Sequence, residues 1–454
     1  MTAYDLVVRG GQVVTETAVV PADVAVRDGV IAALLPRSAE VEAREVIDAE
    51  GRVVLPGVVD PHAHYEMGPG DERYGETKSA VVGGVTSTFT YLLSGRPYSE
   101  ILPQELAKLR AEVRTDVGLH LGMMTDEQLA ELDRYVDEYG IPSFKYFMNF
   151  RGNEGAYLGL GGNDDGFLLR VLEAIGRRPG CVMAVHTENI ELVWTITARL
   201  KEEGREDLAV YSLSRPDYVE STAAHLAATL AEVTGAHIYV PHVSSRRTLD
   251  VLRAAKARGA RVTVETCPHY LAATCYEPLG HLGKVNPPLR GPDDVEALWE
   301  GVADGSIDVV GSDHVPRRAE KKRTGSIWTA SAGFPGTATI LPVMWTEGVR
   351  RRGLSPVRLA QLVSTQPART YGVYPRKGAI RVGADADLVV FDPDAVRPVR
   401  AAELGSFSDY SIFEGRELAG WPELTLLRGR VVGRAGRVLA EPGEGRYLMR
   451  EAGR

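Results

Sequence analysis

The sequence predicts an α/β protein in which a (β/α)₈ barrel, of the TIM-barrel type, is joined to a small β-sandwich domain built from both ends of the chain. Two observations predict this fold. Apolar runs of strand length alternate with amphipathic helical stretches through the middle of the chain, which is typical of parallel βα units. Both ends instead carry short β-like runs separated by turn dipeptides. The chain has 454 residues, enough for one large domain and a smaller companion.

The predicted β-sandwich uses two separate segments. In residues 1–55, valine-rich runs are separated by Gly10-Gly11 and Asp28-Gly29, which are typical of tight hairpins. Residues 376–454 show the same pattern of short β-like runs separated by turn residues. Because a small sheet is marginally stable alone, we expect the two segments to close on each other, with the barrel formed by residues 56–375.

The barrel begins with the stretch from Val53 to His64. Its apolar run, interrupted by Pro56-Gly57, predicts a buried strand that ends at His62 and His64. Residues i and i+2 of a strand point to the same side, so both imidazoles can face one point, where a metal ion would fit. Two unrelated polar residues at a strand end would give the same pattern. The choice between this interpretation and a metal site therefore depends on residues elsewhere in the chain.

Seven more strand candidates follow, with amphipathic helices between most of them. Thr125 to Gln128 form a capping box that opens a predicted helix over residues 129–139, and Ser245 precedes another helix. An open doubly wound sheet is the alternative, but no Gly-rich dinucleotide loop follows an early strand. The eight strand candidates cover residues 53–60, 86–93, 117–122, 141–148, 181–186, 237–242, 261–267 and 307–312.

Metal-capable side chains mark the carboxyl ends of these strands. Lys145 lies late in the fourth strand, His186 ends the fifth, His242 the sixth and Asp313 the eighth. Barrel active sites are assembled at these ends. Histidines and a carboxylate are natural ligands of Zn²⁺ or a similar first-row ion, whereas a lysine ammonium would repel it.

Charge and cysteine content exclude several kinds of partner. The formal net charge is -9 and no basic run is longer than three residues, the length of Lys321-Lys322-Arg323. Both observations argue against nucleic acid and acidic membrane surfaces and favour a small-molecule ligand. The three cysteines form no Cys-x-x-Cys pattern, and no run of about 18 apolar residues occurs. We therefore expect a cytoplasmic protein with no signal peptide and no membrane partner.

Together these residues resemble the amidohydrolase superfamily. The resemblance implies that Lys145 carries a CO₂-derived carbamate bridging two divalent ions, Zn²⁺ or else Mn²⁺ or Co²⁺; a desolvated lysine of lowered pKa can undergo this reaction. A hydroxide shared by the ions would attack a ring carbonyl, and Asp313 would carry its proton to the leaving ring nitrogen. The more buried ion would be held by His62, His64, Lys145 and Asp313, and the more exposed ion by Lys145, His186 and His242.

Within that superfamily the chain is similar to the cyclic amidohydrolases. The resemblance implies hydrolysis of a non-peptide C–N bond in a cyclic amide or ureide by a hydantoinase- or dihydropyrimidinase-like enzyme, with an allantoinase or another cyclic amide or imide hydrolase as the alternative. It also implies a homo-oligomer, a tetramer or a dimer. A non-catalytic dihydropyrimidinase-like scaffold is a further alternative, but all six ligand positions are retained. The motifs are Leu55–Gly57, Glu265–Leu271, Asn286–Arg290, Tyr371–Gly378 and Gly383–Leu388.

The sequence departs from these relatives at predicted substrate contacts. Hydantoinases and dihydropyrimidinases have an oxyanion-supporting tyrosine where this chain has Phe150, and an asparagine where it has Ala332. Dihydroorotases have a carboxylate-binding arginine where this chain has Glu66, which disfavours that activity. Asn286 is the best retained contact. The candidates to replace the missing hydroxyl are Asn149, Tyr65 and His269.

Several other polar residues have structural interpretations. We expect His120, His225 and His237 to be structural histidines and Cys267 to be a buried hydrophobe. Residues 320–323 are expected to form a solvated loop or, alternatively, an entrance lid. Glu188 and Asn189 are expected to orient ligands or to cap the following helix.

Overall fold

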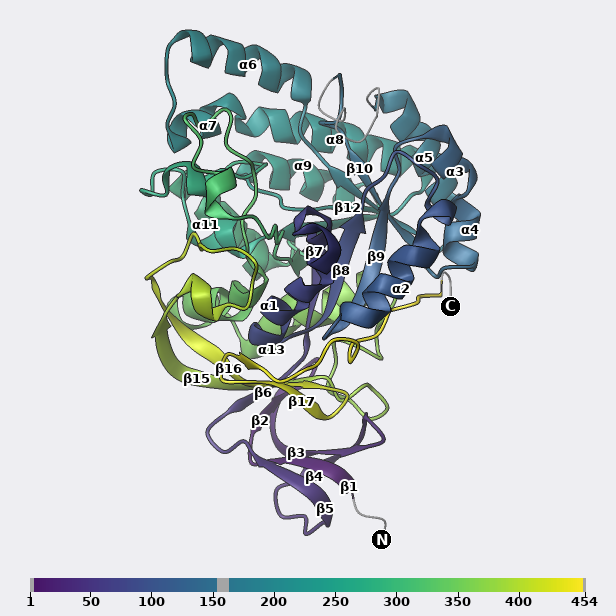
Figure 1. Cartoon of the computed structure of the whole chain (residues 1–454), viewed down its shortest axis with the longest axis vertical. Coiled ribbons are helices and arrows are strands. Elements are labelled where there is room, and N and C mark those ends of the chain that lie inside the picture. The colour runs from purple at the N-terminus through teal and green to yellow at the C-terminus, as the bar shows by residue number, and fades with distance from the viewer. Residues whose placement is uncertain (1–3, 153–162, 452–454) are drawn as a thin grey trace.

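A computed structural model describes residues 4–152 and 163–451, and the (β/α)₈ barrel is its larger part (Figure 1). Within these residues an eight-stranded sheet contains only parallel neighbours, in chain order from first to last. An isolated parallel bridge between Ala63 and His314 joins the first strand to the segment after the eighth and brings the edges together. The strands are β7 (Val58–Ala63), β8 (Val85–Leu92), β9 (Asp116–Gly122), β10 (Ser143–Phe147), β11 (Val182–His186), β12 (Ile238–Val240), β13 (Val262–Thr266) and β14 (Val309–Val310).

Helices cover the outside of the barrel (Figure 1). Two of them begin at the N-cap residues that the sequence predicted. The Ser245 hydroxyl accepts from the Thr248 amide, and the Thr125 hydroxyl accepts from the Gln128 amide, both at 3.3 Å. The helix expected over 129–139 is instead two short helices separated at Glu131. The α-helices are α1 (Thr77–Val82), α2 (Leu102–Glu112), α3 (Asp126–Ala130), α4 (Leu132–Asp137), α5 (Asp165–Gly176), α6 (Ile190–Glu202), α7 (Leu208–Ser214), α8 (Asp217–Thr234), α9 (Arg246–Ala257), α10 (Pro268–Ala272), α11 (Pro292–Asp304), α12 (Ile340–Val343), α13 (Pro356–Ala360) and α14 (Gln366–Thr370).

The two ends of the chain form a second sheet, here called the end sheet, below the barrel in Figure 1. The N-terminal and C-terminal strands meet where β6 pairs antiparallel with β15, Leu55 opposite Val389. This junction confirms the small β-domain predicted from both ends. Its described strands are β1 (Tyr4–Arg9), β2 (Gln12–Val14), β3 (Val19–Arg27), β4 (Val30–Pro36), β5 (Ala43–Asp48), β6 (Val53–Pro56), β15 (Leu388–Pro398), β16 (Glu417–Leu427), β17 (Arg430–Arg434) and β18 (Arg437–Val438).

The apolar run predicted as one strand over 53–60 is two strands in two sheets. β6 belongs to the end sheet and β7 to the barrel, and Gly57 lies between them. A β-carbon at Gly57 would lie 2.2 Å from Thr86 Oγ1, so only glycine fits this crossing. The continuous run therefore ties the end sheet directly to the strand that carries His62.

The C-terminal segment returns from the end sheet to the barrel (Figure 1). The Leu448 amide donates to the Val117 carbonyl at 2.8 Å, and the buried Arg450 guanidinium donates to the Leu119 carbonyl at 2.6 Å and to Ser143 Oγ at 2.7 Å. None of the described helices combines the length and apolar character needed to cross a bilayer.

Candidate metal and active site

The side chains predicted as metal ligands converge at the carboxyl end of the barrel. His62 lies near the end of β7 and His186 is the last residue of β11, whereas His242 and Asp313 follow β12 and β14. Both of the latter have left-handed backbone, with φ of 46° for His242 and 48° for Asp313. Non-glycine residues adopt this conformation at a cost of order 1–3 kcal/mol, and it clusters at functional sites.

His62, His64 and Asp313 form the first cluster. Their ligand atoms all lie within 4.8 Å of one another. Asp313 Oδ1 lies 3.1 Å from His62 Nε2 and 3.5 Å from His64 Nε2. Burial favours the neutral acid, but the neighbouring histidines outweigh it and hold the pKa of Asp313 well below its usual range. The carboxylate is therefore ionised at neutral pH and suited to a cation.

His186 and His242 form the second cluster, and Lys145 lines the same cavity as both of them. His186 Nδ1 lies 3.0 Å from His242 Nε2. Lys145 Nζ is buried, 4.8 Å from the centre of the Tyr91 ring and 4.7 Å from that of Phe147, and it has no hydrogen-bond partner among the described residues. Burial lowers the pKa of Lys145 to about 8. A buried amine without a partner fits a group that is modified and then bound by metal.

Carboxylates lie behind the histidines and fix their rings. Glu66 Oε1 is 2.7 Å from His64 Nδ1, and Glu188 Oε2 is 2.8 Å from His186 Nε2. Each glutamate follows its histidine by two residues. Hydrogen bonds of this kind set the tautomer and orientation of metal-binding imidazoles. The expectation that Glu188 orients a ligand agrees with this contact. Glu66 was expected only to repel a substrate carboxylate, and its contact with His64 gives it an orienting role as well.

Glu265 is a further orienting residue, and the sequence analysis gave it no role. Its Oε1 lies 2.8 Å from His62 Nδ1 and accepts from the His242 backbone amide at 2.9 Å. One carboxylate thus positions one histidine from each cluster. Glu265 is part of the Glu265–Leu271 motif, but its sequence position alone does not show that it faces two other strands.

A cavity of about 210 Å³ opens onto these clusters. Among the predicted substrate contacts, Asn149, Phe150, Asn286 and Ala332 line it. The side-chain oxygen of Asn149 is buried and has no partner in the described part of the chain, whereas that of Asn286 accepts from the Tyr211 hydroxyl. Met67, Arg317 and Ser331 also line the cavity, and the sequence analysis did not predict them.

Tyr65 and His269 do not line this cavity, so neither takes the place that we expected. The Tyr65 hydroxyl lies 3.4 Å from Thr88 Oγ1, and the His269 ring packs edge-on against Phe334 with centroids 4.8 Å apart. Both side chains are buried among barrel residues. Of the three candidates for the missing hydroxyl, Asn149 is the one in the cavity.

Two of the three histidines predicted to be structural agree with their contacts, whereas His225 is exposed on α8. His120 Nδ1 lies 2.6 Å from Ser143 Oγ, and His237 Nε2 lies 2.8 Å from Thr263 Oγ1. Cys267 is buried, and burial raises the pKa of its thiol well above the ordinary value, which agrees with the expected buried hydrophobe. Asn189 accepts from the Leu192 amide at 3.3 Å and caps α6.

The run 320–323 contradicts the expectation of a solvated loop at Lys322. Its ammonium is buried and donates to the carbonyls of Lys284 at 2.7 Å and Gly333 at 2.6 Å. Burial lowers the pKa of Lys322 well below its ordinary value. Because Gly333 lines the cavity beside the two histidine clusters, this lysine supports one wall of that cavity.

Comparisons with known proteins agree with this geometry. Residues 160–432 match the Amidohydrolase family. An L-hydantoinase of Paenarthrobacter aurescens is 34% identical, with 98% of each chain covered, and an allantoinase of Rubrobacter xylanophilus is 36% identical, with 100% of each chain covered. The crystal structure of dihydropyrimidinase from Brevibacillus agri superposes with a TM-score of 0.90 at 31% identity, covering 98% of each chain.

Proposed function

Because the chain belongs to the amidohydrolase family, we propose that it is a metal-dependent hydrolase that opens a cyclic amide or ureide ring, with a hydantoinase or dihydropyrimidinase as the nearest type. The observation that carries this proposal is the buried Lys145 amine, placed without a hydrogen-bond partner in a cavity also lined by His64, His186, His242 and Asp313. A scaffold protein would have no reason to maintain such an arrangement, because an unpaired buried amine costs free energy.

The donor set fits two divalent ions, with Zn²⁺ first and Mn²⁺ or Co²⁺ as alternatives. Such ions polarise a carbonyl and supply hydroxide at neutral pH. The residues proposed to hold them are His62, His64, Lys145 and Asp313 for one ion, and Lys145, His186 and His242 for the other. Lys145 would contribute to both sites as a carbamate, and its lowered pKa supports this because CO₂ reacts with the neutral amine.

Asp313 is the proposed catalytic acid–base residue. Its carboxylate is ionised and faces the cavity, where it can accept a proton from the attacking water and return it to the ring nitrogen that leaves. The apolar walls formed by Phe147, Phe150 and Val285 keep bulk water from the ring. The products are a carboxylate and a free ureido or amide nitrogen, with one water consumed.

Allantoinase activity is the second candidate function. It is favoured by Phe150 and Ala332 in the cavity wall, because neither offers the polar contact expected for a plain hydantoin or dihydropyrimidine ring. The similarity to the allantoinase of Rubrobacter xylanophilus is as high as that to the hydantoinases.

A ring-opening screen with measured metal content tests the proposal. We expect the holoenzyme to contain about two divalent ions per chain and to open at least one compound among hydantoins, dihydropyrimidines, allantoin, dihydroorotate and cyclic imides. His62→Asn should abolish activity and lower metal content, whereas the matched control His237→Asn, far from the cavity, should retain both. Full activity without metal, or no ring opened after reconstitution with Zn²⁺, Co²⁺ or Mn²⁺ and bicarbonate, would contradict the proposal.

We also propose that the protein is cytoplasmic and that it assembles into a homo-oligomer. Three free, buried cysteines support a reducing compartment. Partly exposed apolar side chains on consecutive helices, Trp194, Leu213 and Tyr218, support association between copies. Light scattering on the purified protein would measure the assembly directly, and a monomer would contradict it.

A further inference from the structure

We propose that Arg215 and Tyr211 are positioning residues of the active site. Arg215 supports the two histidines of the second cluster, and Tyr211 fixes the side-chain amide of Asn286. Tyr211 lies on α7 and Arg215 directly follows it, and neither lines the cavity of about 210 Å³, here called the catalytic cavity. This inference rests on the proposed function and deepens it, since it names residues outside the cavity on which the second metal ion and the substrate contact depend.

The first step is the contact of Arg215 with the carboxylate behind His186. Arg215 Nη1 donates to Glu188 Oε2 at 2.7 Å, and the same oxygen lies 2.8 Å from His186 Nε2. An ionised carboxylate can only accept, so this contact places the proton on His186 Nε2 and leaves Nδ1, which is 3.0 Å from His242 Nε2, free to bind an ion. Without Arg215 the carboxylate would be buried without a cation, and its hydrogen bond to His186 would no longer be held in place.

The second step is the contact of the Arg215 main chain with the segment after His242. The carbonyl oxygen of Arg215 accepts from Arg290 Nη1. Arg290 also donates to Ser244 Oγ at 2.9 Å and to Glu220 Oε2 at 3.0 Å, and Glu220 Oε1 accepts from the Ser244 backbone amide at 2.9 Å. Ser244 follows His242 by two residues. The Arg215 position is therefore connected to both histidines of the second cluster, to one by its side chain and to the other by its carbonyl oxygen.

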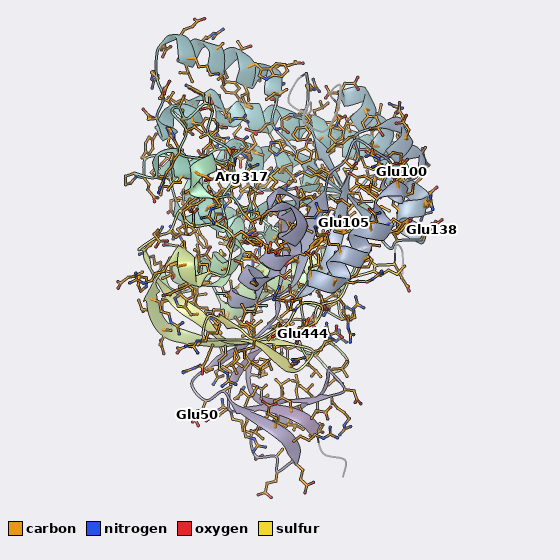
Figure 2. All side chains as sticks on the ribbon, in the orientation of Figure 1. Glu50, Glu100, Glu105, Glu138, Arg317 and Glu444 are labelled. Carbon is orange, nitrogen blue, oxygen red and sulfur yellow. The ribbon has the colours of Figure 1, made fainter. Side chains whose placement is uncertain are left out.

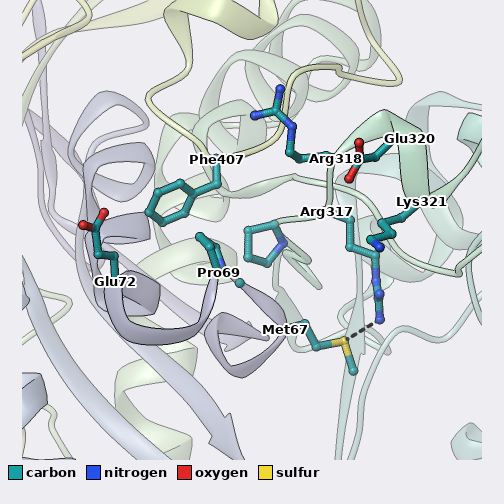
Figure 3. Close-up of a pocket in the computed structure, with 10 residues that line it drawn as sticks. Met67, Pro69, Glu72, Arg317, Arg318, Glu320, Lys321 and Phe407 are labelled. Atoms are coloured by element: carbon teal, nitrogen blue, oxygen red, sulfur yellow. Dashed lines mark hydrogen bonds between the residues drawn. The ribbon is translucent and has the colours of Figure 1, made fainter.

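The third step is burial, which separates this network from other charged groups of the chain. Glu50 and Glu138, at the edges of the molecule in Figure 2, are exposed. Glu72, Arg318 and Lys321, shown in Figure 3 around a surface cavity of about 560 Å³, are exposed as well. The charged side chains of the network are instead at most 8% exposed, namely those of Glu188, Arg215, Glu220 and Arg290. Loss of one buried partner leaves the other uncompensated, whereas an exposed pair is replaced by water.

The fourth step is the contact of Tyr211 with Asn286, which lines the catalytic cavity. Two cations lie over the buried Tyr211 ring, the Arg215 guanidinium 5.6 Å and Lys284 Nζ 4.7 Å from its centre. The Tyr211 hydroxyl donates to Asn286 Oδ1. Because this oxygen is already bonded, the amide is left with its NH₂ group as the donor for a ligand, a match for a carbonyl oxygen of the ring.

Calorimetric titration of the metal-free protein with Co²⁺ tests the role of Arg215. We expect the wild type in bicarbonate to bind about two ions per chain. Arg215→Met should bind the second ion about 10–100-fold more weakly, and Arg290→Met, which breaks the branch to Ser244, should weaken the same ion. Arg215→Lys keeps a cation and should recover most of the lost affinity. The control Arg247→Met removes an exposed arginine that pairs with Asp217 at 2.8 Å, and it should bind both ions as the wild type does.

Steady-state kinetics test the role of Tyr211. Tyr211→Phe removes only the hydroxyl and keeps the ring beside both cations. We expect its KM for hydantoin or allantoin, whichever the wild type opens, to rise about three- to tenfold, the effect of one lost hydrogen bond, while both Co²⁺ ions bind as in the wild type. A role in stability alone would leave the KM of the folded enzyme unchanged. The control Tyr276→Phe, at an exposed tyrosine, should keep the wild-type KM.

Three results would overturn the inference and leave the proposed function standing. They are an unchanged affinity for the second ion in Arg215→Met, a loss of affinity that Arg215→Lys does not recover, and an unchanged KM in Tyr211→Phe. If Arg215→Met does not fold, the titration of Arg290→Met decides, and an unchanged second ion there overturns the inference. If the wild type binds no metal, the proposed function fails first and the inference with it.

Discussion

The buried lysines lie in three different kinds of environment. The Lys145 amine faces the catalytic cavity with no partner among the described residues, Lys322 donates to backbone carbonyls, and Lys377 lies among carboxylates. Burial alone lowers the pKa of a lysine, and this is the outcome at Lys145 and Lys322. At Lys377 the carboxylates outweigh burial and raise the pKa above its ordinary value. Among the described residues, Lys145 is thus the one lysine whose buried amine has no hydrogen-bond partner.

Phe150 is the residue that most clearly separates this site from its hydantoinase-like expectation. Its ring stacks on Phe147, with centroids 4.3 Å apart and planes 10° from parallel, and it borders the cavity. A tyrosine in the same place would add a hydrogen-bond donor near the reacting carbonyl without displacing the stack.

Phe150→Tyr is therefore expected to raise kcat for unsubstituted hydantoin or dihydrouracil by about tenfold, since a donor to the developing oxyanion is worth at least that much in other enzymes. Steady-state kinetics on the wild type and on Phe150→Tyr would measure this change in kcat. Phe167→Tyr, on α5 and outside the cavity lining, is the control and should leave kcat unchanged. An unchanged or lower kcat for Phe150→Tyr would mean that the oxyanion lies elsewhere, with Asn149 as the next donor to test.

At the level of strands and loops, the sequence predicted that the candidate ligand side chains gather in one place, because parallel strands end at one edge of a barrel. His62, His186 and Asp313 could be assigned to that edge from strand order alone. Glu265 could not be given its role, because its contacts with His62 and the His242 amide cross between strands and depend on side-chain direction. The burial of Lys322 was missed for the same reason: a run of charged residues predicts solvent, and its carbonyl partners are remote in sequence.

The loop after β14 is held by two buried ammonium groups. Lys322 joins the carbonyls of Lys284 and Gly333, and Lys284 in turn donates to the carbonyls of Ile327 at 2.7 Å and Trp328 at 3.2 Å. These hydrogen bonds from Lys284 and Lys322 therefore hold the segment whose residues Ser331, Ala332 and Gly333 line the cavity.

Lys322→Met should loosen this loop, because the carbonyl oxygens of Lys284 and Gly333 each lose a hydrogen bond to a charged donor, worth about 1.5–3 kcal/mol. Each oxygen keeps one weaker donor, the Gly333 amide and the Tyr410 hydroxyl respectively. We expect KM to rise several-fold with a smaller effect on metal content, and amide exchange to increase over residues 326–333. Arg323→Met, next in sequence but exposed, should change neither quantity. Unaltered KM and exchange in Lys322→Met would show that the loop is held by other contacts.

For the whole molecule, an ionic cluster links the barrel to the end sheet. Lys377 Nζ lies 2.6 Å from Asp116 on β9, 2.8 Å from Asp385 and 2.6 Å from Asp387, and Arg428 also contacts Asp116 at 2.7 Å. The three carboxylates are close enough to resemble a metal site, but the Lys377 ammonium already occupies the space among them.

Lys377→Met should lower the free energy of unfolding by about 3–5 kcal/mol, because it leaves buried carboxylates without their cation. Denaturant unfolding measures this difference, with Arg376→Met as the exposed neighbouring control. A loss below about 1 kcal/mol would be typical of a solvated surface pair and would rule out this link as a major contributor.

The pairing of β6 with β15 also affects how the protein can be made. Pro56 and Leu388 are partners in the sheet, yet 388 − 56 = 332 residues separate them along the chain. At about 5–20 residues per second, a ribosome needs roughly 15–65 s to deliver the second strand after the first. Throughout that interval β6 has an unpaired edge that other nascent chains could join. Chaperone binding to the newly made N-terminal region is the natural protection during that wait.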